Sequence, residues 1–125
     1  MRALVVDDST AMRSVLRLIF KKAGFEVLEA ANGYEALNKL TEDSTPVDLA
    51  VVDWNMPVMN GYELVTKIRS DERYNGMRIM MVTTESEISH IQSVLAKGAN
   101  EYVMKPFTPD TIQEKLQILG LSAGA

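Results

Sequence analysis

Short apolar runs alternate with segments of helical periodicity along the whole sequence, and this alternation restricts the fold more than any other feature. The apolar runs are residues 3–6, 49–52, 79–82 and 102–104, and a more polar candidate strand covers residues 25–30. Strands joined through helical segments pair in parallel, and the crossover helices then cover both faces of the sheet. The sequence therefore predicts an α/β chain in which five strands alternate with five helices.

The segments between the strands carry apolar residues at three- and four-residue intervals, which is typical of helices with one buried face. The clearest case runs from Met12 to Ala23 and is followed by Gly24, a residue that suits a helix C-terminus. Further helices are predicted near residues 33–40, 61–69, 88–97 and 109–119. The pairs Asn32 with Glu35 and Asn60 with Glu63 indicate capping boxes at two of the helix starts.

Strand composition predicts the order of the sheet. The runs that end at Val6, Val52 and Val82 are apolar throughout, as expected of strands that are buried on both faces. The two candidate strands that carry glutamates, residues 25–30 and 101–104, suit the sheet edges. A flavodoxin-like, doubly wound (βα)5 sheet of order 2-1-3-4-5 puts the second and fifth strands there. We therefore expect one domain over residues 1–125, without an output domain.

Composition disfavours several functional classes. The chain has 125 residues and no cysteine, which excludes disulfides, thiolate metal sites and a thiol nucleophile. Its net charge is −4 and it has no basic tract, so nucleic acid and anionic membrane surfaces are poor partners. No apolar run reaches the length of a membrane span, and the N-terminus lacks a signal-peptide pattern. The sequence predicts a cytoplasmic protein.

Polar residues follow four of the predicted strands. Asp7 and Asp8 follow the first, Asp53 follows the third, Thr83 ends the fourth and Lys105 follows the fifth. In open parallel sheets, ligands bind beyond the carboxyl ends of the strands, where the strand order reverses. For the order 2-1-3-4-5 that point lies between strands one and three. Three carboxylates are therefore expected to converge there.

Such a group of carboxylates has a defined chemistry. Three carboxylates this close repel one another unless a cation lies among them. Oxygen ligands without His or Cys favour Mg²⁺ over Ca²⁺ or Zn²⁺. A carboxylate beside Mg²⁺ and a lysine ammonium can act as a nucleophile toward a phosphoryl group. Each aspartate alone is explained as well by helix capping, but three at the switch point are not.

The same residues resemble the receiver domains of two-component response regulators. The resemblance covers Leu4 to Leu119, and within the family it is greatest to the CheY group of chemotaxis regulators. It rests on motifs that occur in one order: Val5-Val6-Asp7-Asp8-Ser9, Val52-Asp53-Trp54-Asn55-Met56-Pro57, Asn60-Gly61, Thr83, Gly98-Ala99 and Lys105-Pro106-Phe107-Thr108. The resemblance implies a stand-alone response regulator of a phosphorelay.

The resemblance also implies how the phosphoryl group is received. Asp53 would be the phosphoacceptor, and Lys105, after a cis bond to Pro106, would pair with the phosphoryl oxygens. Asp8, Asp53 and the backbone carbonyl of Asn55 would hold Mg²⁺, with Asp7 contributing through water. A histidine kinase would be the phosphodonor.

Signal output is likewise implied by the resemblance. Thr83 would move to hydrogen-bond the phosphoryl group and Tyr102 would follow it as an aromatic switch. Asn55 and Glu85 would flank the route of the hydrolytic water, and Thr84 is larger than the residue usual in the family. The face formed by the fourth helix, fifth strand and fifth helix would bind a downstream protein, for which chemotaxis offers the flagellar motor switch.

Smaller expectations concern the same face and its surroundings. Residues 98–100 are expected to form a flexible corner, with Lys97 and Lys115 nearby as cationic contacts. His90 is the only histidine. We expect it to be a surface residue rather than a ligand or a phosphodonor, because no second histidine or carboxylate is patterned around it.

Other functions remain open to different degrees. Nothing in the sequence excludes a phosphorelay carrier that passes its phosphoryl group to a histidine phosphotransfer domain. An aspartate-dependent phosphatase needs an acid two residues after the nucleophile, where this chain has Asn55. Flavin binding is disfavoured because Asp7 and Asp8 would repel the flavin phosphate. We therefore expect a phosphoacceptor switch that assists its own phosphorylation and dephosphorylation, and not an enzyme acting on a separate substrate.

Overall fold

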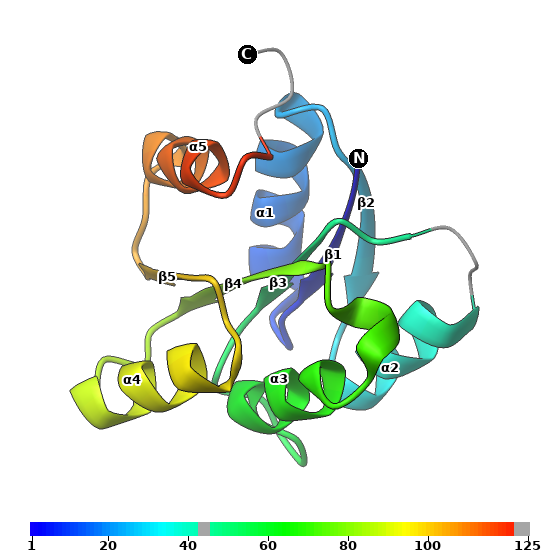
Figure 1. The fold of residues 1–125 in the computed structure, drawn as a ribbon. Coiled ribbons are helices and arrows are strands. Elements are labelled where there is room, and N and C mark those ends of the chain that lie inside the picture. The colour runs from blue at the N-terminus through cyan, green and yellow to red at the C-terminus, as the bar shows by residue number, and fades with distance from the viewer. Residues whose placement is uncertain (43–45, 122–125) are drawn as a thin grey trace.

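The computed structural model describes residues 1–42 and 46–121, and these form a five-stranded parallel sheet between two layers of helices (Figure 1). The strands are β1 (Arg2–Val6), β2 (Glu26–Ala30), β3 (Leu49–Val52), β4 (Arg78–Thr83) and β5 (Glu101–Met104). Their order is β2-β1-β3-β4-β5, with every pairing parallel, which confirms the predicted flavodoxin-like topology. Strand β2 begins one residue later than predicted.

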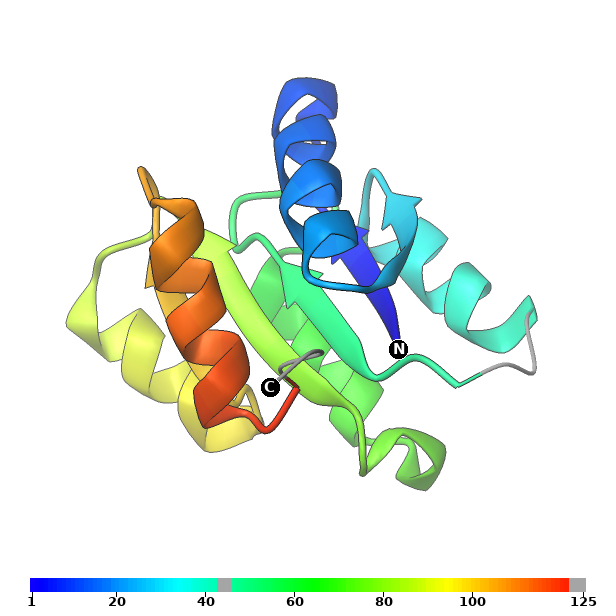
Figure 2. The same ribbon diagram turned by 90° about the horizontal axis from the view of Figure 1, so that it is seen from above.

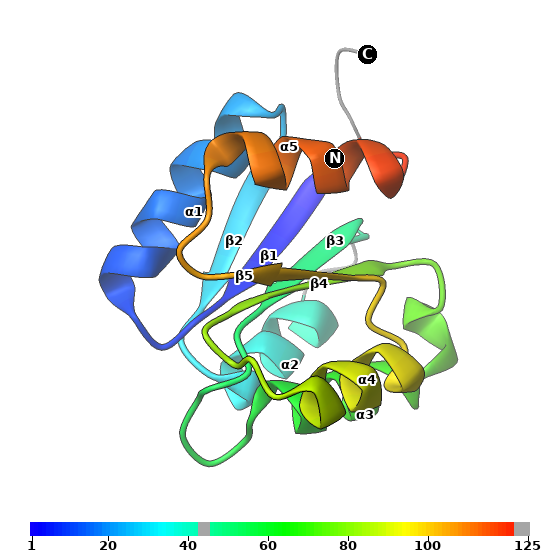
Figure 3. The same cartoon turned by 90° about the vertical axis from the view of Figure 1, so that its left-hand side faces the viewer.

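The helices are α1 (Thr10–Lys22), α2 (Gly33–Glu42), α3 (Gly61–Arg69), α4 (Ile88–Lys97) and α5 (Pro109–Ile118). Helices α1 and α5 cover one face of the sheet, and α2, α3 and α4 cover the other (Figures 2 and 3). A short 3-10 turn at Glu72–Tyr74 was not predicted, because three residues are too few for a periodic pattern. No helix in the described ranges is long and apolar enough to cross a membrane.

Alternate residues of the central strands bury into two separate cores. In β1, Ala3 and Val5 pack with Leu16 and Phe20 of α1, whereas Leu4 and Val6 pack into the cluster under α2, α3 and α4. Both faces of β1, β3 and β4 are therefore covered, which explains why these strands are apolar throughout. Because these strands are packed on both faces, the positions at which the loops leave their carboxyl ends are fixed.

Side chains at the helix starts fix where each loop ends. Asn60 and Glu63 form the predicted capping box, with each side chain accepting the backbone N–H of the other residue. Asn32 accepts the backbone N–H of Glu35 at 2.8 Å, which is the N-cap half of the second predicted box. Ser9 caps α1 directly after the acidic pair and was not singled out from the sequence. The caps hold the loops that carry the candidate site.

Gly61 allows α3 to begin directly against the loop after β3. A Cβ atom at this position would lie 2.5 Å from the backbone oxygen of Asp53 and 2.8 Å from the Cα of Trp54. Both contacts are with backbone, so a side chain could be accommodated only by moving the loop. The Gly61 N–H also donates to the Trp54 carbonyl at 2.9 Å. Glycine at this position thus sets where Asp53 lies.

Gly61→Ala should destabilise the domain by about 1–3 kcal/mol, the usual range for overpacking a rigid site. Gly76→Ala is the matched control, because a Cβ there meets no atom within 4 Å. It should change stability by no more than about 0.5–1 kcal/mol in either direction. Urea unfolding followed by Trp54 fluorescence measures both variants. Equal stabilities of the two variants would contradict the close packing at Gly61.

Candidate functional site

The three aspartates that the sequence predicts to converge do lie together, where β1 and β3 end. Val6 and Val52 are register partners, and the Asp53 N–H donates to the Val6 carbonyl at 3.0 Å, so the ladder continues past the strand ends. One carboxylate oxygen from each of Asp7, Asp8 and Asp53 lies within 4.8 Å of the others. Asp7 and Asp53 are buried and Asp8 is exposed. The cluster is therefore open to solvent on the Asp8 side.

Lys105 enters this cluster from the end of β5. Its bond to Pro106 is cis, as expected, and its backbone N–H donates to the Thr83 carbonyl at 2.8 Å. The Lys105 ammonium lies 2.8 Å from Asp7 Oδ2 and 3.4 Å from Asp53 Oδ2. One ammonium cannot neutralise three carboxylates. The oxygen ligands and the charge that remains fit a hard divalent cation such as Mg²⁺.

The backbone of Glu85 joins the ends of β4 and β5. Its N–H donates to the Oγ1 of Thr83, which is fully buried, at 3.2 Å. Its carbonyl accepts the Tyr102 hydroxyl at 2.6 Å. Burial raises the pKa of Tyr102 to about 12, with further contributions from the charges of Glu85 and Asp53. The phenol therefore stays protonated and remains a donor over the physiological range.

Asn55 and Glu85, the two residues expected to flank the hydrolytic water, make different contacts. The Asn55 N–H donates to Asp53 Oδ1 at 3.3 Å, and its side-chain amide donates to Thr84 Oγ1 at 3.2 Å. Thr84 thus ties the loop after β3 to the end of β4. The Glu85 carboxylate instead accepts the backbone N–H of Glu87 at 2.9 Å. Asn55 contacts the candidate acceptor directly, whereas Glu85 is drawn toward α4.

Comparison with known proteins identifies the family of this fold and site. Residues 3–117 match the family model of the response regulator receiver domain. This chain belongs to that family. Receiver domains act as signalling switches of two-component systems rather than as classical enzymes, and they bind Mg²⁺ at an acidic pocket. This receiver domain has an aspartate cluster formed by Asp7, Asp8 and Asp53.

Individual relatives agree with the family assignment. The chain is 44% identical over 126 residues to a chemotaxis protein CheY homolog of Campylobacter jejuni, covering 99% of this chain and 96% of that protein. It is 43% identical over 120 residues to chemotaxis protein CheY1 of Helicobacter pylori, covering 95% and 96%. The structure of chemotaxis protein CheY4 of Vibrio cholerae superposes with a TM-score of 0.86 at 38% identity, covering 94% and 97%.

A further solved structure bears on the acidic pocket. Response regulator protein TrrA of Thermotoga maritima, in complex with Mg²⁺ and BeF, superposes with a TM-score of 0.81 at 36% identity. The alignment covers 94% of this chain and 97% of that one. The fold of the receiver domain is therefore shared with a protein that holds Mg²⁺ and a beryllofluoride group.

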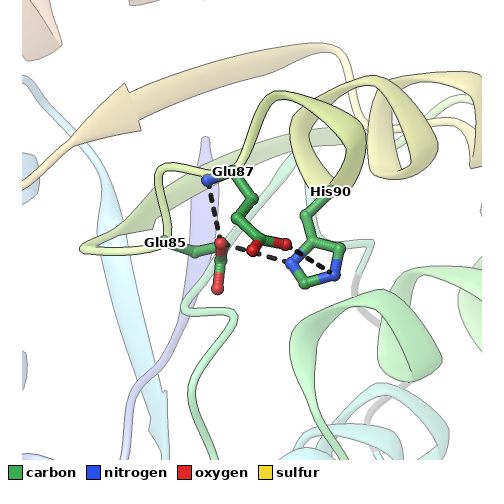
Figure 4. Close-up of side chains that lie close together, drawn as sticks. All are labelled: Glu85, Glu87 and His90. Carbon is green, nitrogen blue, oxygen red and sulfur yellow. Dashed lines mark hydrogen bonds and ion pairs between the residues drawn. The ribbon is translucent and has the colours of Figure 1, made fainter.

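The side chain of His90 is 43% exposed, in keeping with a surface residue, but two carboxylates contact its ring, which the sequence analysis did not indicate. Its Nδ1 lies 3.2 Å from Glu85 Oε1 and its Nε2 lies 3.4 Å from Glu87 Oε2 (Figure 4). The imidazole also stacks on the Trp54 ring, with centroids 4.8 Å apart and planes 14° from parallel. The three-residue spacing of Glu87 and His90 could have indicated one of these contacts. Sequence spacing alone gave no sign of the contacts with Glu85 and Trp54.

Two arginines that sequence reasoning did not single out donate hydrogen bonds to residues around the site. Arg13 donates to the Asp7 carbonyl at 2.7 Å. Arg69 donates to the Gly98 carbonyl at 3.0 Å and to Asn100 Oδ1 at 3.0 Å. Burial, followed by the charge of a nearby arginine, lowers the pKa of Arg69 from its usual value. Arg69 of α3 therefore contacts residues 98–100 at both ends, and the flexibility expected of this corner stays a prediction.

Glu85→Gln should make the free energy of unfolding depend less on pH in the acidic range. The backbone N–H of Glu87 lowers the pKa of Glu85 in the folded domain, and His90 lowers it further. The carboxylate therefore adds stability above its ordinary pKa of 4.5, and this contribution is lost as the pH falls toward the folded value. Urea unfolding across this pH range should show that the free energy of unfolding falls more steeply in wild type than in Glu85→Gln. Equal slopes in wild type and Glu85→Gln, with Glu114→Gln as control, would contradict this linkage.

Proposed function

We propose that this receiver domain is a phosphoacceptor switch, in which a histidine kinase phosphorylates Asp53 in the presence of Mg²⁺. The observation that carries the proposal is the pairing of Lys105 with both Asp7 and Asp53, which places an ammonium between two buried carboxylates and orients the Asp53 side chain. An ionised, oriented carboxylate is the nucleophile that phosphoryl transfer needs. The lysine that orients it can also pair with phosphoryl oxygens.

Mg²⁺ would be held by Asp8, Asp53 and the backbone carbonyl of Asn55, with Asp7 contributing through water. When bound, it would screen the negative charge on the transferred group. The oxygen-only ligands at the ends of β1 and β3 support this assignment. The Mg²⁺ and BeF complex of TrrA supports it as well, since beryllofluoride mimics an acyl phosphate.

In the transfer step, a carboxylate oxygen of Asp53 forms a bond to phosphorus while the bond between phosphorus and the donor's imidazole nitrogen breaks. The products are an aspartyl phosphate and the free histidine of the kinase. The Asn55 N–H and the Lys105 ammonium already contact the two carboxylate oxygens of Asp53, one each. These groups orient the nucleophile before the donor arrives, which lowers the entropic cost of the reaction.

The phosphoryl group would reach the rest of the domain through Thr83. A phosphoryl oxygen on Asp53 would accept a hydrogen bond from the Thr83 hydroxyl, and a movement of that hydroxyl toward it would disturb the bond that Thr83 Oγ1 accepts from the Glu85 N–H. The Glu85 carbonyl holds the Tyr102 hydroxyl, so a shift at Thr83 is transmitted to β5 through one residue. Thr83 and Tyr102 would therefore act as the switch pair. A ligand shifts such an equilibrium only by its different affinity for the two states.

The output surface would be the face of α4, β5 and α5. It carries the exposed apolar residues Ile88, Leu95 and Met104, which suit a protein partner. Lys97 is an exposed cation on this face, whereas Lys115 pairs with Glu101 at 2.8 Å. The chemotaxis names of the relatives favour a role in motility control in the cytoplasm, with the flagellar motor switch as the target.

The lifetime of the phosphoryl group would depend on Asn55 and Glu85. Asn55 lies beside Asp53 and is small and polar, so water can approach from its side. Glu85 Oε1 lies 3.2 Å from His90 Nδ1, and its carboxylate would flank the other side of the water's route. Rapid hydrolysis supports a switch that is reset quickly. The same loops would serve a phosphorelay carrier, for which movement at Tyr102 is not needed.

With Mg²⁺ and acetyl phosphate, intact-mass spectrometry should show a single phosphoryl group that is acid-stable and base-labile. Asp53→Asn should abolish it. Asp8→Ala should slow labelling at least about tenfold, since even groups that only orient a metal ligand contribute that much. Asp110→Asn, an exposed carboxylate on α5, is the control and should label as wild type does. Equal labelling of Asp53→Asn would place the acceptor elsewhere and refute the proposal.

A further inference from the structure

Glu85, Glu87 and His90 form a second group of metal-ligand side chains, separate from the three aspartates (Figure 4). One ligand atom from each residue lies within 4.8 Å of the others. Glu85 lies on the loop after β4, and Glu87 and His90 lie at the start of α4. The function proposed above uses Glu85 but needs neither the imidazole nor a metal ion at these three side chains.

The spacing of the ligand atoms fits one ion. His90 Nδ1 and Glu85 Oε1 are 3.2 Å apart. Two ligands of a tetrahedral Zn²⁺, each about 2.0–2.1 Å from the ion, are separated by about 3.3 Å. Nδ1 is buried, and among the described residues it has no hydrogen-bond partner of acceptable geometry. A cation between these two atoms would satisfy both of them.

Two of the three ligands are already oriented. The imidazole is fixed by its stacking on Trp54, and Glu85 Oε1 is held by the Glu87 N–H at 2.9 Å. Contacts of this kind orient metal ligands and raise affinity. The Glu87 side chain is 68% exposed and lies on the Nε2 edge of the ring, so a side-chain rotation brings its carboxylate to the ion. Water would complete the coordination.

We propose that Glu85, Glu87 and His90 bind a divalent transition-metal ion of the zinc class. An imidazole with two carboxylates suits Zn²⁺, Co²⁺ or Ni²⁺, whereas oxygen ligands alone suit Mg²⁺. The receiver domain would thus carry two cation sites with opposite preferences, one where β1 and β3 end and one between β4 and α4. The ligand chemistry of each site decides which ion it takes.

The ion would act on the loop that carries the switch, and this consequence rests on the proposed function. The Glu85 backbone bonds to Thr83 Oγ1 and to the Tyr102 hydroxyl. An ion shared by Glu85 and His90 would tie that loop to α4. Two ligands that restrain the same loop must change each other's affinity, by linkage. Zn²⁺ should therefore alter the affinity for beryllofluoride.

The single histidine makes the test specific. Untagged, ¹⁵N-labelled protein is titrated with Zn²⁺ in saturating Mg²⁺, and the two ring nitrogens of His90 are followed by NMR. The ring signals should shift and saturate at one equivalent. His90→Gln and Glu85→Gln should each bind at least about tenfold more weakly. Asp8→Ala, in which the aspartate cluster is damaged, and the exposed control Glu114→Gln should bind as wild type does.

Several results would overturn the site. Ring nitrogens that do not respond to excess Zn²⁺, or equal affinity in wild type and His90→Gln, would refute it. Binding that survives in His90→Gln and is lost in Asp8→Ala would place Zn²⁺ on the aspartates instead. Beryllofluoride affinity that is unchanged by bound Zn²⁺ in wild type would refute the link to the switch and leave the site standing. Beryllofluoride that fails to bind without Zn²⁺ would count against the proposed function alone.

Discussion

The contact of the Lys105 ammonium with the carboxylates of Asp7 and Asp53 is the interaction on which the site depends. Parallel pairing of β1 and β3 forces the two buried acids to lie side by side, and buried like charges are costly unless a cation accompanies them. Lysine supplies part of that charge from β5, two strands away from β3. The negative charge that remains uncompensated would favour a divalent cation at the cluster.

A second constraint connects the acidic cluster to the rest of the domain. Glu85 bonds through its backbone to Thr83 and Tyr102, and through its carboxylate to the first turn of α4. One residue thus joins the fourth strand, the fifth strand and the fourth helix. The proposed switch and the proposed transition-metal site both act through this residue. His90 connects it further to the Trp54 ring, beside the candidate acceptor.

Much of the fold and the acidic cluster could be predicted because the signals are local. Periodicity located the helices, uniform apolarity located the central strands, and parallel strands bring their carboxyl ends to one edge. Asp7, Asp8 and Asp53 therefore converge by topology alone. The stacking of His90 on Trp54 and the hold of Arg69 on residues 98–100 could not be predicted, because they join side chains on different elements at no fixed spacing. Such contacts depend on how the helices pack against one another, and the sequence of one segment does not determine that packing.

The most direct measurement is the change in backbone chemical shifts when beryllofluoride is added with Mg²⁺. A phosphorylation-driven switch predicts shifts at Thr83, Glu85 and Tyr102 and across the face of α4, β5 and α5, with none of them in Asp53→Asn. Shifts confined to the loops around Asp53, with Tyr102 and α4 unchanged, would contradict the switch and favour a phosphoryl carrier.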